Sequence, residues 1–136
     1  EGLRRGTLDA ARQRIHGDVR LDSFIWDGSD ASITGYGGEP GRPAEEQVLK
    51  RSPLRDIAQM LCAIDDAAPT ASARRRLVGA WWDGYLASGA QLPGGEGRAL
   101  LVEVFVLDHR LAQLRRGDTA ALAPLTTPLG RDNFGF

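Results

Sequence analysis

The sequence predicts a mainly α-helical fold with one small β-hairpin, an α+β class, built as a single domain over residues 1–136. Three segments between residues 52 and 116 carry apolar residues at three- and four-residue spacings, the periodicity of amphipathic helices. One pair of short β-prone runs precedes them. A chain of 136 residues suits one compact domain and is too short for two of ordinary size.

The hairpin is expected just before the helices. Its two runs, Phe24–Trp26 and Ala31–Thr34, are separated by Asp-Gly-Ser-Asp at 27–30, a composition typical of a turn. The following segment, 36–43, reads Tyr-Gly-Gly-Glu-Pro-Gly-Arg-Pro. We expect a loop there, because glycines loosen the backbone and prolines remove hydrogen-bond donors.

The three long helices have recognisable ends. Ser52 is placed to cap the first helix, with Pro53 at its first position. The second helix is expected between Thr70 and Ser88, and the third over 98–116, with Gly117 just past its end. The apolar face of the first helix consists of Leu54, Ile57, Ala58, Leu61 and Ile64.

The two ends of the chain give weaker patterns. Residues 3–14 are compatible with a short amphipathic helix, although Gly6 weakens it. The chain opens inside this expected helix without an initiator Met, which suggests a processed, truncated or excised piece. Residues 118–136 contain Pro124 and Pro128 and predict an irregular tail.

The composition excludes several classes of function. Net charge is -1, and basic residues are interleaved with acidic ones, so no nucleic-acid surface is expected. No run approaches the roughly 18 apolar residues of a membrane span, and the charged N-terminus is unlike a signal peptide. The single cysteine, Cys62, excludes an intrachain disulfide and a thiolate cluster, which favours a cytoplasmic location.

One tripeptide, His16-Gly17-Asp18, falls in the expected loop between the first helix and the hairpin. There the scaffold can hold a side chain facing a cleft. A phosphotransferase needs a carboxylate to orient the attacking hydroxyl and accept its proton, and Asp18 has the right chemistry. The structural alternative is that Asp18 caps a turn.

Three segments in order carry a resemblance: His-Gly-Asp at 16–18, Gly-Glu-Pro-Gly-Arg-Pro at 38–43, and Lys-Arg-Ser-Pro-Leu-Arg-Asp at 50–56. They resemble the core of maltokinases, a branch of the aminoglycoside-phosphotransferase and protein-kinase-like superfamily. The resemblance is plain over 15–68, and residues 99–116 are similar to the family's last helix. It implies the helical C-terminal lobe of the kinase fold, with a catalytic-loop region at 15–43 and a helical bundle at 52–116.

The resemblance also implies roles for individual residues. Asp18 would be the catalytic base of an ATP-dependent sugar kinase that uses magnesium and acts on a sugar such as maltose or an amino sugar. His16 and Asp56 would support the loop, with Asp56 accepting hydrogen bonds from its backbone. Glu39 and Arg42 would line the sugar cleft or pair with each other; the alternative is that they are solvated.

Two positions depart from the family pattern. Ser23 stands where relatives present an amide ligand for magnesium, and its hydroxyl is a poor substitute. Gly35 stands where relatives carry the aspartate that holds the metal against the nucleotide. Neither Asp22 nor Asp30 falls in the place needed to compensate, so phosphoryl transfer is expected to be impaired.

Aromatic residues of the second helix offer a possible sugar platform. Trp82 and Tyr85 could stack on a sugar face, but adjacent helical residues diverge by about 100 degrees, so one of Trp81 and Trp82 is expected in the core. His109 is expected to be structural. Two histidines and one cysteine so far apart do not have the spacing of a zinc site.

Three hypotheses remain. In the first, the chain is a kinase-like C-terminal lobe with impaired catalysis, whose missing N-terminal lobe would hold ATP; Lys50 is in the wrong place to do so. In the second, it is a non-catalytic interaction or sugar-binding domain that associates with itself or with enzymes of trehalose or α-glucan metabolism. In the third, it is part of a divergent but active kinase.

Overall fold

The computed structural model describes residues 12–38, 41–90, 92 and 97–121. It is mainly helical with one two-stranded antiparallel sheet, which confirms the predicted fold class. The elements, in chain order, are η1 (Leu21–Ser23), β1 (Phe24–Trp26), β2 (Ala31–Ile33), α2 (Ala44–Gln47), α3 (Leu54–Ala67), α4 (Ala71–Ala87) and α5 (Arg98–Arg115).

The long helices lie where the periodicity predicts them. The Ser52 hydroxyl accepts a hydrogen bond from the amide of Leu54 at 3.3 Å, although the N-cap position itself belongs to Pro53. The Thr70 hydroxyl caps α4 by accepting from the amide of Ala73 at 3.1 Å. The predicted boundaries therefore agree with the observed ones to within one or two residues.

Two local features differ from the expectation. Ala44–Gln47 forms one helical turn, α2, which the sequence analysis did not predict; its two glutamates suit a helix N-terminus. Gln13 is paired in an antiparallel bridge with Arg51, with N to O distances of 3.0 and 2.8 Å, so the helix expected over 3–14 does not extend to it. Residues 1–11 and 122–136 lie outside the described residues.

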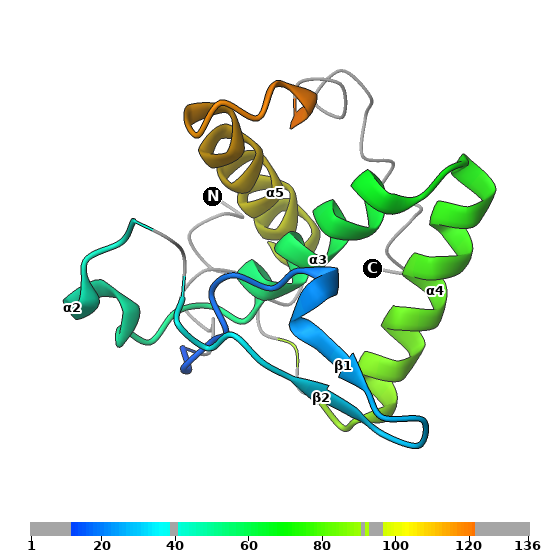
Figure 1. The fold of residues 1–136 in the computed structure, drawn as a ribbon. Coiled ribbons are helices and arrows are strands. Elements are labelled where there is room, and N and C mark those ends of the chain that lie inside the picture. The colour runs from blue at the N-terminus through cyan, green and yellow to red at the C-terminus, as the bar shows by residue number, and fades with distance from the viewer. Residues whose placement is uncertain (1–11, 39–40, 91, 93–96, 122–136) are drawn as a thin grey trace.

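Helix α3 is the centre of the core. It packs against both α4 and α5, and Figure 1 shows it between them. Its buried residues point in every direction around the axis, as in a helix covered on all sides. Burial raises the pKa of Cys62 to about 12, so its thiol stays protonated. The buried residues of α3 are Leu54, Ile57, Ala58, Gln59, Met60, Leu61, Cys62 and Ile64.

A charged cluster joins the three long helices. Arg110 of α5 is only 1% exposed, and its Nη1 lies 2.7 and 2.8 Å from the two carboxylate oxygens of Asp66 on α3. Its Nη2 lies 3.3 Å from Asp65, which also pairs with Arg74 of α4. Because an unpaired charge is costly to bury, this cluster fixes how the helices pack.

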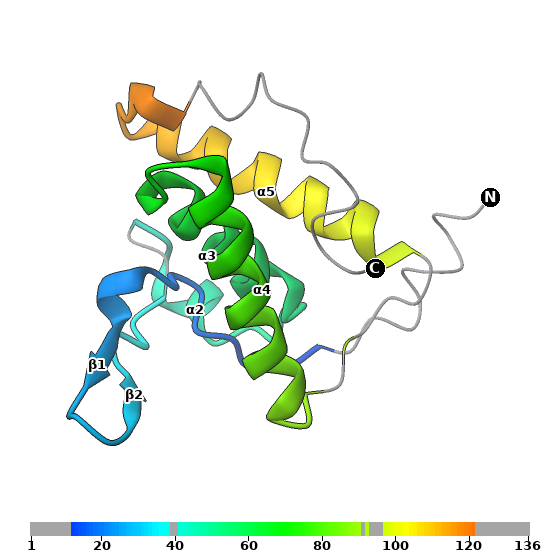
Figure 2. The ribbon, with the colours of Figure 1, turned by 90° about the vertical axis from the view of Figure 1, so that its right-hand side faces the viewer.

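The hairpin stands at one edge of the helical bundle (Figure 2). Phe24 pairs with Ile33 and Trp26 with Ala31. At the turn, Asp27 Oδ1 accepts hydrogen bonds from the amides of Asp30 and Ser29, both at 2.8 Å, and these bonds lower the pKa of Asp27. The side chain of Asp27 therefore shapes the predicted turn. Among the described residues, no helix has both the length and the apolar character to cross a bilayer.

Candidate functional site

The loop that contains Asp18 is held by a carboxylate of α3. Asp56 Oδ2 accepts the amide of His16 at 2.7 Å, and Oδ1 accepts the amide of Gly17 at 2.9 Å. Two successive amides facing one carboxylate form an anion-binding nest, and Gly17 has a φ of 83°, which other residues rarely adopt. The Asp56 carboxylate therefore links α3 to the backbone of the loop.

A second α3 side chain continues this attachment. The side-chain amide of Gln59 accepts from the amide of Val19 at 2.9 Å and donates to the carbonyl of Gly17 at 2.8 Å. Residues 56 and 59 are three apart and share one helix face, so α3 contacts the loop along two turns. Gln59 was not predicted from the sequence to hold the loop. The available signal was a polar residue inside a run of apolar ones.

Burial raises the pKa of Asp56, and the amides of Gly17 and His16, which favour the charged form, offset this effect only in part. The carboxylate that anchors the loop is therefore held at an energetic cost. Because the pKa of Asp56 differs between the folded and unfolded states, its protonation is linked to folding.

His16 connects the loop to the hairpin. Its ring is buried, and Nε2 lies 2.7 Å from the carbonyl of Thr34, while the amide of Asp18 lies 3.3 Å from Nδ1. A carbonyl can only accept and an amide can only donate, so these partners assign a neutral imidazole with its hydrogen on Nε2. The ring also lies 4.9 Å from that of Tyr36. The His16 side chain therefore links the loop to the residue that follows β2.

Asp18 faces a polar pocket. Its side chain is 18% exposed, and Oδ2 lies 3.6 Å from Nε of Arg20, which is itself well exposed and 3.4 Å from Asp22. The pocket has a volume of about 350 Å³ and is open to solvent. Side chains from η1, α3 and α5 line it, including Asp22, Gln59, Asp66, His109 and Gln113.

Ser23 is used to build the turn before the hairpin. The residue is buried, and its hydroxyl accepts the amide of Arg20 at 3.2 Å. Its carbonyl accepts the amide of Thr34 at 2.8 Å. Ser23 is not among the described residues that line the pocket beside Asp18. Its polar groups therefore hold η1 and the hairpin in place.

Gly35 has a backbone conformation that residues with a side chain rarely adopt. Its φ is 85°, and a Cβ there would lie 3.8 Å from the His16 ring, so the conformation rather than the space restricts the position. In the described part of the chain, no group of three or more His, Cys, Asp or Glu residues is placed to hold a metal ion. The residues at 23 and 35 do not fit the magnesium site that the resemblance implies.

The described residues that were proposed for a sugar cleft do not lie in one pocket. Glu39 lies outside the described residues. Arg42 lines a second pocket, which does not include Trp82 or Tyr85. These two rings are stacked on α4, with centroids 5.9 Å apart, and pack with Trp81 against the core. Burial raises the pKa of Tyr85. The structure does not bring Trp82 and Tyr85 together with Arg42.

No protein-family model matches this chain.

Replacing Asp56 with Ala should lower the free energy of unfolding by about 2–4 kcal/mol, because two loop amides lose their acceptor and each partly buried donor costs about 1–3 kcal/mol. Urea unfolding followed by circular dichroism measures the change. Asp83→Ala, an exposed position on α4, is the control and should change stability by less than about 0.5 kcal/mol.

The pH dependence gives this prediction a second signature. Burial raises the pKa of Asp56 in the folded state above its ordinary value of 3.8. The free energy of unfolding of the wild type should therefore exceed that of Asp56→Asn by the largest amount at pH values below 3.8. This advantage should decline as the pH rises through the folded-state pKa. A difference between the two proteins that stays constant with pH would contradict the burial of this carboxylate.

Proposed function

We propose that this chain is the C-terminal lobe of a maltokinase-type sugar kinase fold that has lost phosphoryl transfer and keeps a sugar-binding cleft. The observation that carries the proposal is the loop 16–18, held by the Asp56 carboxylate through two amides while positions 23 and 35 provide no carboxylate. This combination supports the proposal of a catalytic-loop scaffold without metal ligands.

The pocket beside Asp18 supports the sugar-binding part of the proposal. Its size falls in the range of small-molecule sites, about 300–1,000 Å³. Asp18, Asp66 and Gln113 present oxygen and nitrogen atoms with which sugar hydroxyls form hydrogen bonds. Asp18 would orient one hydroxyl of the sugar. In an active relative, ATP would be held by an N-terminal lobe from the same or another polypeptide.

The loss of activity follows from electrostatics. A metal ion in phosphoryl transfer neutralises charge that develops on the transferred group, and its removal costs several kcal/mol of transition-state stabilisation. The Ser23 hydroxyl is occupied by the amide of Arg20, and Gly35 has a positive φ. Substitution of Gly35 by Asp would therefore strain the backbone as well as add a ligand.

Calorimetric titration tests both parts of the proposal. The chain should show no saturable binding of magnesium-ATP at micromolar concentrations. Maltose or glucosamine should bind, and Asp18→Asn should weaken that binding at least about tenfold, since a hydrogen bond to a charged group is lost. Asp83→Asn on α4 is the matched control, because it removes the same charge away from the pocket.

Micromolar binding of magnesium-ATP by the chain alone would contradict the loss of activity. Equal sugar affinity in Asp18→Asn and Asp83→Asn would contradict the assigned cleft.

The hairpin favours a second candidate function, a non-catalytic interaction domain. Trp26 is 67% exposed and Tyr36 is 70% exposed, with Ile25 and Ile33 also at the surface. An isolated two-stranded sheet is marginally stable, and exposed apolar strands are surfaces for association. Under this candidate the hairpin would contact a second copy of the chain or an enzyme of trehalose or α-glucan metabolism.

Sedimentation velocity distinguishes the two candidates. If the hairpin mediates self-association, Trp26→Lys should weaken the dimer by at least about tenfold, as expected for a central aromatic contact. Leu86→Lys, at an exposed apolar position on α4, is the control and should leave the dimer unchanged. If the chain remains monomeric at every concentration measured, the hairpin does not mediate self-association.

A further inference from the structure

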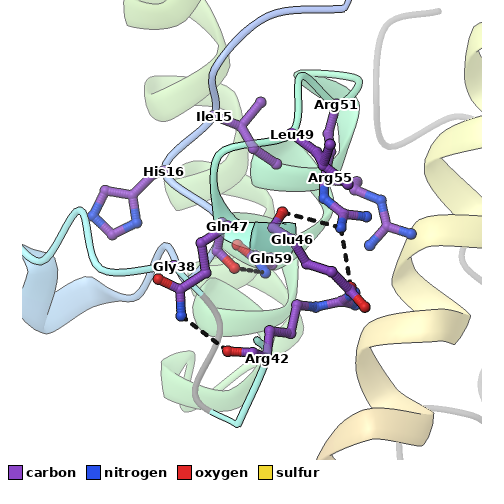
Figure 3. A pocket seen from close by; sticks show the side chains of 11 residues that line it. Ile15, His16, Gly38, Arg42, Glu46, Gln47, Leu49, Arg51, Arg55 and Gln59 are labelled. Atoms are coloured by element: carbon purple, nitrogen blue, oxygen red, sulfur yellow. Dashed lines mark hydrogen bonds and ion pairs between the residues drawn. The ribbon is translucent and has the colours of Figure 1, made fainter. Parts of the chain in front are cut away.

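A second pocket is rich in arginine and is lined in part by residues 15–17 of the same loop. Arg42, Arg51 and Arg55 line it, together with Glu46, Gln47 and backbone of the loop 15–17 (Figure 3). Three segments supply the arginines: the residues before α2, the residues before α3, and α3 itself. Glu46 is the one acidic residue among the described lining residues.

The carboxylate of Glu46 bridges two of these arginines. Its Oε2 lies 3.1 Å from Nη1 of Arg42 and 3.4 Å from Nη2 of Arg51, and Figure 3 shows both guanidinium groups directed toward it. Arg55 extends toward α5, where it pairs with Asp108 at 3.2 Å. One carboxylate therefore faces two guanidinium groups, while the charge of Arg55 is paired with Asp108.

We propose that this pocket binds an oxyanion of the phosphate class through Arg51 and Arg42, and that Glu46 occupies the anion's place when it is absent. Guanidinium groups donate pairs of hydrogen bonds to phosphate oxygens in a fixed geometry. The Glu46 oxygen between the two arginines marks a position that a phosphate oxygen can take.

Arg51 is preorganised for this role. Its backbone is paired with Gln13 through two hydrogen bonds, so the base of the side chain is anchored. Its side chain is 24% exposed and lies within the pocket. Holding a binding group in place reduces the entropy that binding must overcome.

The internal carboxylate is a weak competitor. The Arg42 and Glu46 pair joins residues four apart, and the Glu46 side chain is 46% exposed, so solvent screens the attraction. A phosphate dianion brings twice the charge of the carboxylate. With Glu46 in place the pocket encloses only about 30 Å³, so the anion takes the position that the Glu46 carboxylate vacates.

The proposal is independent of the proposed function, because Asp18, Ser23 and Gly35 are not among the residues that line this pocket. The phosphate group could belong to a free ion or to a sugar phosphate. Titration with inorganic phosphate and with a hexose 6-phosphate separates these sources: tighter binding of the ester assigns the pocket to a sugar phosphate, and equal or weaker binding assigns it to the free ion.

The experiment is calorimetric titration of the full 136-residue chain with sodium phosphate, at constant ionic strength maintained with sodium chloride. Saturable binding is expected. Arg51→Gln should weaken it at least about tenfold through the loss of charge-assisted hydrogen bonds. Glu46→Gln should strengthen it, because the competing carboxylate is removed. Arg75→Gln, an exposed position on α4 outside the pocket, should bind like the wild type.

Two results would overturn the proposal: no saturable binding by the wild type, or equal affinity in Arg51→Gln and Arg75→Gln. If Arg51→Gln does not fold, Glu46→Gln decides the question. Unchanged or weaker phosphate binding by that variant would show that Glu46 does not occupy the anion's position.

Discussion

The two hydrogen bonds from the amides of His16 and Gly17 to the Asp56 carboxylate fix the loop to the buried helix α3. Gln59 adds two more bonds one turn later. The hairpin depends on the same loop, because the His16 ring contacts the carbonyl of Thr34. Since α3 is itself held between α4 and α5, the position of Asp18 follows from the packing of the bundle.

The residues that hold the loop differ from the residues at which metal ligands would be expected. The contacts that hold the loop come from α3, whereas Ser23 and Gly35, the two positions that differ from the maltokinase pattern that the sequence resembles, lie at the two ends of the hairpin. The Ser23 hydroxyl accepts the amide of Arg20, and its carbonyl accepts the amide of Thr34. Gly35 has a positive φ, which side chains disfavour. Neither residue supplies a contact between the loop and α3, so the proposed absence of metal ligands at these positions is compatible with an intact loop.

Local sequence patterns predicted the fold better than the site. Periodicity identifies α3 and the two later helices because one face of each is apolar, and the turn composition identifies the hairpin. The contact of Asp56 was expected from the resemblance. Gln59 and Arg110 were missed because periodicity does not show which polar residue finds a buried partner distant in sequence. The separation of Arg42 from Tyr85 has the same origin, since the relative placement of helices is a long-range property.

Amide hydrogen exchange is the most direct test of the central claim that α3 holds the loop. The amides of His16 and Gly17 should exchange nearly as slowly as those in the middle of α3, because they open only when the contact with Asp56 breaks. Gly28, exposed at the tip of the hairpin, provides the fast reference. Exchange of His16 and Gly17 at the rate of Gly28 would contradict the account.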